Sequence, residues 1–268
     1  MSAKTKEITV PAPQHLVTVI MASTLEDVGL LRRSCASILE QTHTNFELLL
    51  LIDGPVQGEL IAELKRDLSD VRICVLYSAK RRGLARSLNI LCRLAKGELI
   101  ARMDDDDVAV PERLEWQVKA IAAGYDVVGG AIRLFSEDAC ENNQRVVPGW
   151  NFEKRPSPFA LVFRHLIAHP AVMYRKSWIL RHRYDRAWGR GQDRELWVRT
   201  IDDGRFHSVE NVVLLYRRPL RLKRVQLANA RNTSRVILKH WRKLSWQAPM
   251  LLLVSMVREV IYRLRAFQ

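Results

Sequence analysis

Four short apolar runs alternate with helical patterns over roughly the first 110 residues of the chain. Each run is continuously hydrophobic, which is typical of a strand buried on both faces of a parallel sheet. Between the runs, apolar residues recur at three- and four-residue intervals, the period of an amphipathic helix. The predicted strands cover residues 16–22, 46–52, 71–77 and 99–103, and helices are predicted after residue 23, over 57–68 and over 83–96, the last closed by Gly97. This alternation predicts an α/β fold with a Rossmann-like, mostly parallel nucleotide-binding half.

The pattern is less regular after residue 110. The tandem glycines Gly129 and Gly130 interrupt a strand-like run, which indicates that another group approaches the backbone closely there. Residues 136–158 have no clear period and predict a long loop of the functional or mobile kind. The other predicted elements are helices at 111–123, 159–166, 191–200, 222–245 and 248–266 and strands at 125–135, 169–174 and 209–216.

Length and composition bound the class of protein. The 268 residues, 48% hydrophobic and 27% charged, are enough for one large globular domain or one domain with an appendage. The four cysteines are irregularly spaced, which fits neither a zinc site nor a disulfide framework and favours a reducing compartment. The polar N-terminus predicts no signal peptide, and without an apolar run of 18 residues we expect no conventional membrane-spanning helix.

The formal charge of +14 is concentrated at the C-terminus. From Arg217 onward there are 13 Lys or Arg and one acid, whereas residues 1–216 carry only +2. A basic segment on a nearly neutral body indicates a polyanionic partner, either an anionic membrane surface or a nucleic acid. We therefore expect an N-terminal tail at 1–15, a nearly neutral domain at 16–218 and a basic helical tail at 219–268.

Four consecutive carboxylates, Asp104 to Asp107, follow the last of the early strands. Adjacent carboxylates repel one another, each contact costing about 1 kcal/mol even at high dielectric, so the run is either fully solvated or neutralised by a cation. Because ligands of open α/β sheets bind beyond the carboxyl ends of the strands, a hard divalent ion with phosphate as co-ligand is favoured. Both the G-x-G-x-x-G fingerprint and the Walker A loop are missing, so a nucleotide would bind by other means.

Four short motifs, in order along residues 16–218, resemble those of the inverting family 2 glycosyltransferases of the GT-A fold, especially bacterial polysaccharide-building members. Leu51-Ile-Asp-Gly-Pro is similar to the family's Asp-Asp-Gly-Ser turn, with Ile52 in place of one acid. Gly83-Leu-Ala-Arg-Ser-Leu-Asn is similar to its Gly-Leu-Ala helix, and the Asp104 segment resembles its D-x-D motif. Gln192-Asp-Arg-Glu-Leu-Trp resembles its acceptor-site Glu-Asp-x-x-Leu-Trp motif.

The resemblance implies a nucleotide-sugar donor, a UDP-sugar with uracil as its base, at the strand ends. In that assignment Asp53 accepts a hydrogen bond from the base, backbone near Ala22 lies against the base, and Arg82 contacts the donor. The alternatives are a turn aspartate at Asp53 and a merely solubilising arginine at Arg82.

The D-x-D match implies a Mn²⁺ or Mg²⁺ site that neutralises the leaving diphosphate. Asp106 is then the direct metal ligand, Asp104 lies near the ribose or sugar and the metal, and Asp105 occupies the variable middle position of the donor site. Asp107 is assigned a structural role. The alternative is a solvated acidic loop before the helix that Pro111 opens.

The acceptor-site match makes Asp193 the general base, which removes the proton of the acceptor hydroxyl as that hydroxyl attacks the anomeric carbon. Its alternative is an ordinary acid in the first turn of a helix. Trp197, one turn later, is interpreted as a core residue, and His169 as either a site residue or a structural histidine.

The last helix combines a wide apolar face with tryptophans and basic residues, a pattern that favours an in-plane anchor on an anionic membrane. The alternative is a helix packed on the catalytic domain. We therefore expect a cytoplasmic enzyme, peripheral on the inner face of the cell membrane, that acts on a glycan or polyprenyl-lipid-linked acceptor and binds no nucleic acid. The rival functions are a sugar-nucleotide pyrophosphorylase, whose N-terminal phosphate loop is missing, and a nucleic-acid-binding protein, whose signatures are missing.

Overall fold

The computed structural model describes residues 15–135, 145–217 and 222–266. In this part of the chain nine strands form one mixed sheet, in the order β3-β2-β1-β4-β8-β6-β9-β5, with β7 paired to β6. The strands are β1 (Val17–Ser23), β2 (Phe46–Asp53), β3 (Ile73–Ser78), β4 (Leu99–Met103), β5 (Val108–Ala109), β6 (Val127–Phe135), β7 (Val146–Val147), β8 (Met173–Arg175) and β9 (Phe206–Arg217).

The first four strands form the predicted parallel half. β1 pairs in parallel with β2 and β4, and β2 pairs in parallel with β3. The connecting helices are α1 (Val28–Leu39), α2 (Gly58–Asp67) and α3 (Leu84–Leu94). Asp27 caps α1, its Oδ1 accepting a hydrogen bond of 3.0 Å from the Leu30 N–H. The alternation of strands and helices that the sequence predicts is confirmed.

The second half reverses direction at β8, which is antiparallel to both β4 and β6. The strand predicted at 169–174 is wrong in its first half, because His169–Ala171 forms a 3₁₀ turn, η2. Pro170 has no N–H to donate to a sheet, so the chain joins the ladder only after it. The helices here are α4 (Arg113–Ala122), α5 (Pro158–Phe163), α6 (Lys176–His182), which was not predicted, and α7 (Gln192–Thr200).

Three glycines mark close approaches of backbone. A Cβ on Gly129 would lie 2.8 Å from Ile167, and one on Gly130 would lie 2.6 Å from Val213, as the tandem pair predicts. The prediction that Gly97 closes α3 is wrong, since the helix ends at Leu94 with an extended C-cap at Ala95. A Cβ on Gly97 would lie 2.5 Å from the Leu16 carbonyl oxygen, so this glycine lets the chain pass close to β1.

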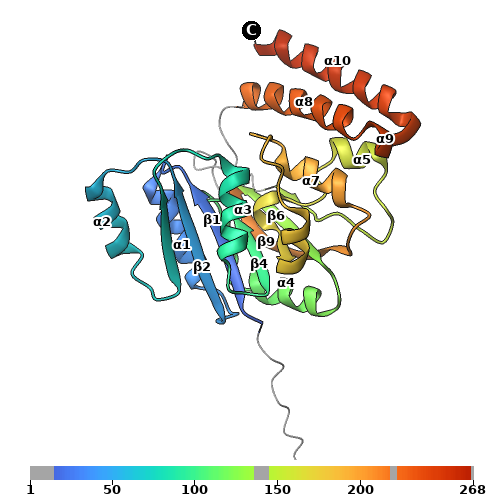
Figure 1. The fold of residues 1–268 in the computed structure, drawn as a ribbon. Coiled ribbons are helices and arrows are strands. Elements are labelled where there is room, and N and C mark those ends of the chain that lie inside the picture. Colours follow the sequence, from blue (N-terminus) through green and yellow to red (C-terminus); the bar gives the residue numbers. More distant parts are fainter. Residues whose placement is uncertain (1–14, 136–144, 218–221, 267–268) are drawn as a thin grey trace, which may run out of the picture.

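Helices cover both faces of the sheet and bury two apolar cores (Figure 1). On one face α1, α2 and α4 pack on the sheet through Leu31, Leu64 and Leu114. On the other face α3 and α5 to α8 pack through the fully or almost fully buried side chains of Leu88, Leu161, Ile179, Leu196 and Val236. Because successive residues of a strand point to opposite faces, a strand covered on both sides must be apolar throughout, which explains the unbroken runs.

The C-terminal helices pack on the catalytic body as a helical hairpin. They are α8 (Leu222–Lys239), α9 (Trp241–Leu244), the short η3 (Ser245–Gln247) and α10 (Ala248–Ala266). α8 contacts α5 and α7, and α10 contacts α8 (Figure 1). The buried Ser255 of α10 donates to the Ala230 carbonyl oxygen of α8 at 3.2 Å, and its Oγ lies 2.9 Å from that of Ser234. The domain boundary predicted at residue 218 falls outside the described residues.

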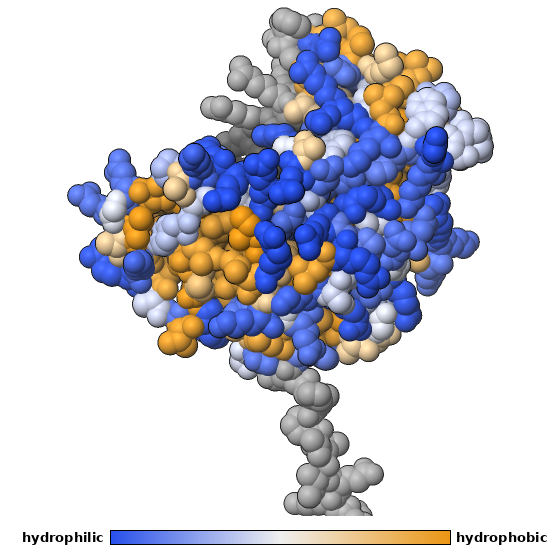
Figure 2. All heavy atoms as spheres, in the orientation of Figure 1, coloured by the Kyte–Doolittle hydropathy of each residue, from blue (hydrophilic) through white to orange (hydrophobic). Residues whose placement is uncertain are grey.

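The outer face of this hairpin is apolar. Figure 2 shows hydrophobic side chains on α10, at the top of the view, beside hydrophilic ones. The exposed apolar side chains are Leu238, Trp241, Trp246, Met250, Leu253, Met256, Val257, Val260, Ile261 and Leu264. In the described part of the chain the segment Trp241–Leu264, with mean hydropathy 1.2 in its most apolar window, is long and apolar enough to cross a membrane. Length and composition thus allow a membrane-spanning helix that was not expected from the sequence, whereas α10 also pairs with α8 through buried contacts.

Three of the four cysteines fall in the described residues, and all three are free thiols. Cys35 and Cys92 are buried and Cys74 is exposed. None of these three forms a disulfide, in agreement with the expectation from their spacing.

Candidate active site

The carboxyl ends of β1, β2 and β4 meet at one edge of the sheet, because the three strands are parallel neighbours. A cleft of about 920 Å³ lies along this edge. Its lining includes Ala22 and Asp104, Asp105 and Asp106, a part called the carboxylate end below. It also includes Asp193 and its neighbours on α7 and α8, a part called the α7 end. The fold therefore brings the two predicted halves of the site into one cleft.

Arg102 holds Asp104 in place at the end of β4. This arginine lies in the middle of an apolar strand and is only 2% exposed. Its Nη1 donates to Asp104 Oδ2 at 2.9 Å, and its Nη2 donates to Asp104 Oδ1. A buried guanidinium is stable only with such a bidentate partner, so the pair fixes the orientation of the Asp104 carboxylate. Sequence reasoning missed this role, although a single arginine inside an apolar strand signals it.

Asp104, Asp106 and Asp107 form a group of three carboxylates whose oxygens lie within 4.8 Å of one another. Asp107 Oδ1 accepts a hydrogen bond of 2.8 Å from the Arg217 N–H. Asp107 Oδ2 is buried and has no hydrogen-bond partner among the described residues. Carboxylate oxygens suit Mg²⁺ or Mn²⁺, so the donor set fits the predicted ion. Asp107, which the sequence analysis treats as structural, lies within reach of the same ion as Asp104 and Asp106.

The electrostatics of this group favour a cation. Burial, followed by the negative charges of Asp104 and Asp105, raises the pKa of Asp106 to about 6, while Arg217 lowers it. Burial and the Asp104 charge likewise raise the pKa of Asp107 well above its usual range. Carboxylates held this close resist ionisation together, and a bound cation or proton relieves the repulsion.

Asp105 differs from its three neighbours. It lines the cleft but lies outside the three-carboxylate group, and its side chain is hydrogen-bonded to Ser23 at the end of β1. Its assignment to the donor site stays a prediction.

Asp53 and Arg82 lie beside the cleft, not in it. Asp53 lines a neighbouring hollow of about 260 Å³, which shares Thr24 with the main cleft. The Asp53 carboxylate accepts hydrogen bonds of 2.8 Å from the N–H groups of Arg82 and Gly83, and so it fixes the turn that begins α3. The Arg82 side chain is exposed, and its Nε donates to Ser78 Oγ at 2.8 Å. A contact of either side chain with a nucleotide stays a prediction.

Asp193 lies in the first turn of α7, two residues after the N-cap Gly191, whose φ of +73° favours glycine. Burial raises the pKa of the Asp193 carboxyl, but His169, Arg194 and the Arg194 N–H lower it more, and the net pKa is below its ordinary value. Asp193 is therefore ionised at neutral pH, as a general base must be. The adjacent Gln192 is 6% exposed, and its Oε1 has no partner among the described residues.

His169 is buried and is hydrogen-bonded in series with two tyrosine hydroxyl groups. Its Nε2 lies 2.8 Å from Tyr184 Oη, which lies 2.8 Å from Tyr174 Oη. Burial, helped by the positive charge of Arg102, lowers the pKa of His169 to about 3, so the imidazole is neutral at pH 7. These contacts suit the structural interpretation of His169, although the residue also lines the cleft. Trp197 is 4% exposed within the apolar core, as predicted.

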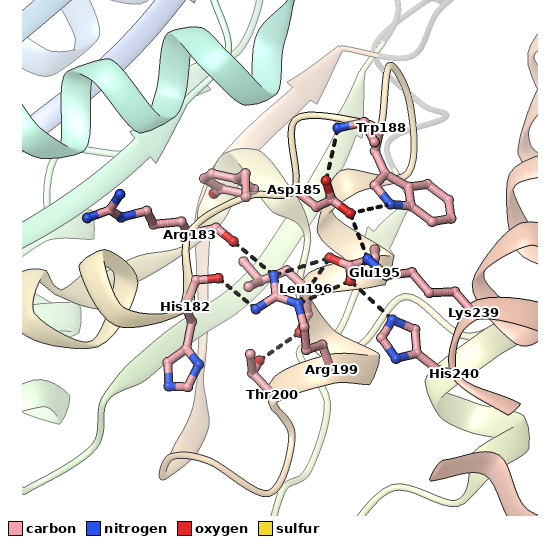
Figure 3. A network of polar contacts seen from close by, with 12 residues as sticks. His182, Arg183, Asp185, Trp188, Glu195, Leu196, Arg199, Thr200, Lys239 and His240 are labelled. Carbon is pink, nitrogen blue, oxygen red and sulfur yellow. Dashed lines mark hydrogen bonds and ion pairs between the residues drawn. The ribbon is translucent and has the colours of Figure 1, made fainter. Parts of the chain in front are cut away.

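A polar network around the buried Glu195 fastens α8 to α7 (Figure 3). The Glu195 carboxylate of α7 is fully buried and binds Lys239 Nζ at 2.8 Å, His240 Nε2 at 3.1 Å and Arg199 Nε at 3.1 Å. Lys239 also pairs with Asp185 at 2.6 Å. Burial raises the pKa of Glu195, but hydrogen bonds from His240, Arg199 and Lys239 outweigh it and hold the pKa at about 2. The sequence analysis assigned no role to this network.

Because α8 is held in this way, it forms part of the cleft wall. Asn229 and Asn232 of α8 line the cleft at the α7 end. Arg194 of α7 also lines it and donates through Nη1 to Thr233 Oγ1 of α8 at 2.5 Å. The C-terminal segment is thus part of the site as well as a candidate membrane surface.

The sequence profile of glycosyl transferase family 2 matches residues 18–183. The chain belongs to glycosyl transferase family 2. This membership confirms the predicted family and enzyme class, and it argues against the pyrophosphorylase alternative. The match ends before α7, so it does not bear on Asp193, Glu195 or α8, and the assignment of Asp193 as the general base stays a prediction.

Relatives of this glycosyltransferase include an uncharacterized glycosyltransferase of Methanocaldococcus jannaschii, 30% identical over 77% of this chain and 72% of the relative. The O-antigen biosynthesis glycosyltransferase WbnJ of Escherichia coli is also 30% identical, over 69% of this chain and 72% of its own length.

Two solved structures share the fold. The mannosyltransferase PcManGT from Pyrobaculum calidifontis, in complex with GDP-Man and Mn²⁺, has a TM-score of 0.63 at 16% identity and covers 90% of this chain and 73% of its own. The 1–349 fragment of S. aureus TarS with UDP has a TM-score of 0.59 at 16% identity, and the match covers 84% of this chain but only 65% of that fragment. The Rossmann-like GT-A fold predicted from the sequence is confirmed.

Proposed function

We propose that this glycosyltransferase moves a sugar from a nucleotide-diphosphate donor, a UDP-sugar, to a hydroxyl of a glycan or lipid-linked acceptor, with inversion at the anomeric carbon. The observation that carries the proposal is the arrangement of the cleft. Asp104 and Asp106 of the metal-capable carboxylate group line the same cleft as a single ionised carboxylate, Asp193. The name of the Escherichia coli relative, an O-antigen enzyme, supports cell-surface polysaccharide synthesis as the process.

The carboxylate end suits the donor. Asp104, Asp106 and Asp107 would hold a Mn²⁺ or Mg²⁺ ion, and the Mn²⁺ in the PcManGT complex supports this choice. When bound, the ion neutralises the diphosphate as it leaves. The neighbouring hollow, with Asp53 on one side and Pro55, Val56 and Leu60 as apolar walls, would take the base. UDP in the TarS complex supports uracil as that base.

The α7 end suits the acceptor. Asp193 accepts the proton of the attacking hydroxyl, and the oxygen displaces the nucleoside diphosphate from the opposite face of the sugar. A single displacement needs one base and no nucleophilic carboxylate, and it inverts the configuration. The orphaned Gln192 Oε1 beside Asp193 would accept a hydrogen bond from a second acceptor hydroxyl.

The C-terminal hairpin supports a cytoplasmic enzyme peripheral to the inner membrane face. The outer side of α10 is exposed and apolar, and Trp246 beside it is 79% exposed. The 13 Lys or Arg from Arg217 onward would attract an anionic leaflet.

A donor screen tests the proposed reaction. The purified protein is incubated with UDP-, GDP- and dTDP-sugars, with Mn²⁺, with Mg²⁺ and with EDTA, and release of nucleoside diphosphate is measured. We expect release from one UDP-sugar that EDTA abolishes. Release that is equal in EDTA would contradict metal dependence, and release from GDP-sugars alone would contradict the choice of base.

A further inference from the structure

Two arginines, one on α7 and one on α10, lie near the part of the cleft that borders the C-terminal hairpin. Arg194 of α7 lines the cleft, and Arg258 projects from α10. The Arg258 guanidinium lies over the Phe163 ring, 5.3 Å from its centroid, and Phe163 ends α5 two residues before His165, which lines the cleft. Arg258 thus contacts the helix that leads into the cleft lining at His165.

The positive charges of these arginines act on one another and on the cleft. Desolvation lowers the pKa of Arg194 most, and the positive charge of Arg258 lowers it further. The negative charge of Asp193 raises it, but the net pKa stays below its usual value. Desolvation and the Arg194 charge lower the pKa of His165, and Arg258 lowers it further. The only carboxylate among the causes of these shifts is Asp193, the proposed base. The site therefore has an excess of positive charge at its acceptor end.

The other contacts of the two arginines leave donors available. Arg194 donates through Nη1 to Thr233 Oγ1, and Arg258 donates to Tyr262 Oη at 3.3 Å. Among the ion pairs of the described residues, those of α10 join Glu259 to Arg231 and Arg263, and none includes Arg258. Each guanidinium has five N–H donors, so most donors of Arg194 and Arg258 remain free for an anion.

The surface beyond Arg258 is apolar. On α10, Val257 is 49% exposed and Ile261 is 40% exposed, and both continue into the apolar face described above. An anionic group held at Arg258 would therefore have a hydroxyl-binding cleft on one side and an apolar surface on the other. A sugar joined through phosphate to a long-chain lipid has its groups in this same order: hydroxyls, then an anion, then an apolar chain.

We propose that Arg194 and Arg258 form a subsite for the phosphate or diphosphate that links the acceptor sugar to its lipid. This inference rests on the proposed function and makes its acceptor specific: the sugar lies at Asp193, the phosphate between the two arginines, and the lipid chain along α10. Planar guanidinium groups bind phosphate oxygens in pairs, which gives both affinity and orientation. The subsite would then set the distance from the membrane at which the acceptor hydroxyl reaches Asp193.

Geranyl diphosphate, a soluble prenyl diphosphate, is the probe for the first test. It is titrated calorimetrically in EDTA, so that the carboxylate group holds no metal that could bind the diphosphate. We expect binding by the natural protein and, because one charge-assisted contact contributes about 1.5 kcal/mol or more, binding roughly tenfold weaker or worse in Arg258→Gln. The matched control is Arg263→Gln, which removes an equal charge from α10 at an exposed arginine paired with Glu259. We expect it to bind the probe within about twofold of the natural protein, since its effect is only long-range and screened.

Vesicles of phosphatidylglycerol separate a phosphate subsite from attraction to lipid headgroups. Both variants should sediment with these vesicles to the same reduced extent, since each loses one positive charge. The subsite is contradicted if the natural protein does not bind geranyl diphosphate, or if the two variants lose that binding equally. It is also contradicted if Arg258→Gln lowers only vesicle binding. Equal melting temperatures of the two variants would exclude misfolding as the cause.

The same preparations separate this inference from the proposed reaction. Binding of UDP in the presence of Mn²⁺ involves the carboxylate end, and neither arginine variant should change it. Absence of UDP binding in all three proteins would contradict the proposed donor, whereas intact UDP binding with no response of geranyl diphosphate to Arg258→Gln would contradict the subsite alone.

Discussion

The two ends of the cleft use the same side chain in opposite electrostatic settings. At the carboxylate end, burial and neighbouring acids raise the pKa of Asp106 to about 6. At the α7 end, His169 and Arg194 hold the pKa of Asp193 below its ordinary value in spite of burial. The first setting destabilises isolated carboxylates and favours a cation, and the second stabilises a lone anion that can accept a proton. In the proposed reaction, neighbouring groups and not the residue type would therefore divide the work between binding the donor and activating the acceptor.

The largest expected effect comes from removing the lone anion. Asp193→Asn keeps the size of the side chain but cannot accept the hydroxyl proton, so transfer should fall by about 10²- to 10⁴-fold. Binding of UDP with Mn²⁺, measured by calorimetry, should stay unchanged because the carboxylate end is intact. Full transfer activity in this variant would contradict the assignment of the base.

At the carboxylate end, by contrast, we expect a substitution to weaken UDP binding. Asp106→Ala removes one of three oxygen ligands, and metal-dependent UDP binding should weaken by about 100-fold or more, since loss of an outer-shell partner alone costs up to that much. The matched control is Glu98→Gln, which removes a carboxylate at the other end of β4. If UDP binding in Mn²⁺ survives Asp106→Ala, the proposed metal site is wrong.

The next effect is expected on the free energy of unfolding, from the Glu195 network that fastens α8 to α7. The folded-state pKa of Glu195 is about 2, against an ordinary value of 4.5. Because the folded-state value is the lower one, the stabilisation is complete above about pH 5 and is lost as the pH falls towards 2. Glu195→Gln should therefore lower the free energy of unfolding by about 2–3 kcal/mol at pH 7. Denaturant titrations should show that this gap narrows below pH 4.5.

The control for this experiment is Glu210→Gln on the exposed surface of β9, where we expect no change. A gap between the natural protein and Glu195→Gln that is the same at pH 7 and pH 3 would show that the ionised carboxylate does not stabilise the network.

The smallest effect is expected at the surface of the hairpin. Trp246→Ser removes a side chain that is 79% exposed, so folding should be unchanged while affinity for anionic vesicles falls roughly tenfold. Sedimentation with phosphatidylglycerol vesicles at two salt concentrations measures it. Val71→Ser, at a fully exposed apolar residue before β3, is the control. Equal losses in the two variants would count against a membrane role for the hairpin.

Most of the parallel half could be predicted because its residues are constrained by local patterns. The strands of residues 46–52 and 99–103 are apolar throughout, and their bounds agree with β2 and β4 within one residue. The η2 turn and α6 were missed, since the first depends on Pro170 in its tertiary setting and the second is short and lies between loops. Periodicity carries little information about segments of that length.

The candidate site was predictable where its residues are consecutive and not where they are assembled by packing. The Asp run is visible in the sequence. However, the turn after β4 decides that the Asp105 side chain is hydrogen-bonded to Ser23, whereas Asp107 belongs to the metal-capable group. Likewise, no local pattern relates Glu195 to Lys239, because these two residues are 44 positions apart in the sequence and lie on different helices. The family match, which ends at residue 183, offers no help there.

The packing of α8 against α7 affects how the molecule unfolds. The buried Glu195 carboxylate binds Lys239 and His240, and Val236 and Leu251 belong to the same apolar core as the sheet. The C-terminal hairpin therefore cannot melt independently without exposing that core and leaving the Glu195 charge unpaired. Heating should produce one cooperative transition that includes both the sheet and the hairpin. A protein truncated before α8 would be an incompletely folded chain, not a soluble form of the same enzyme.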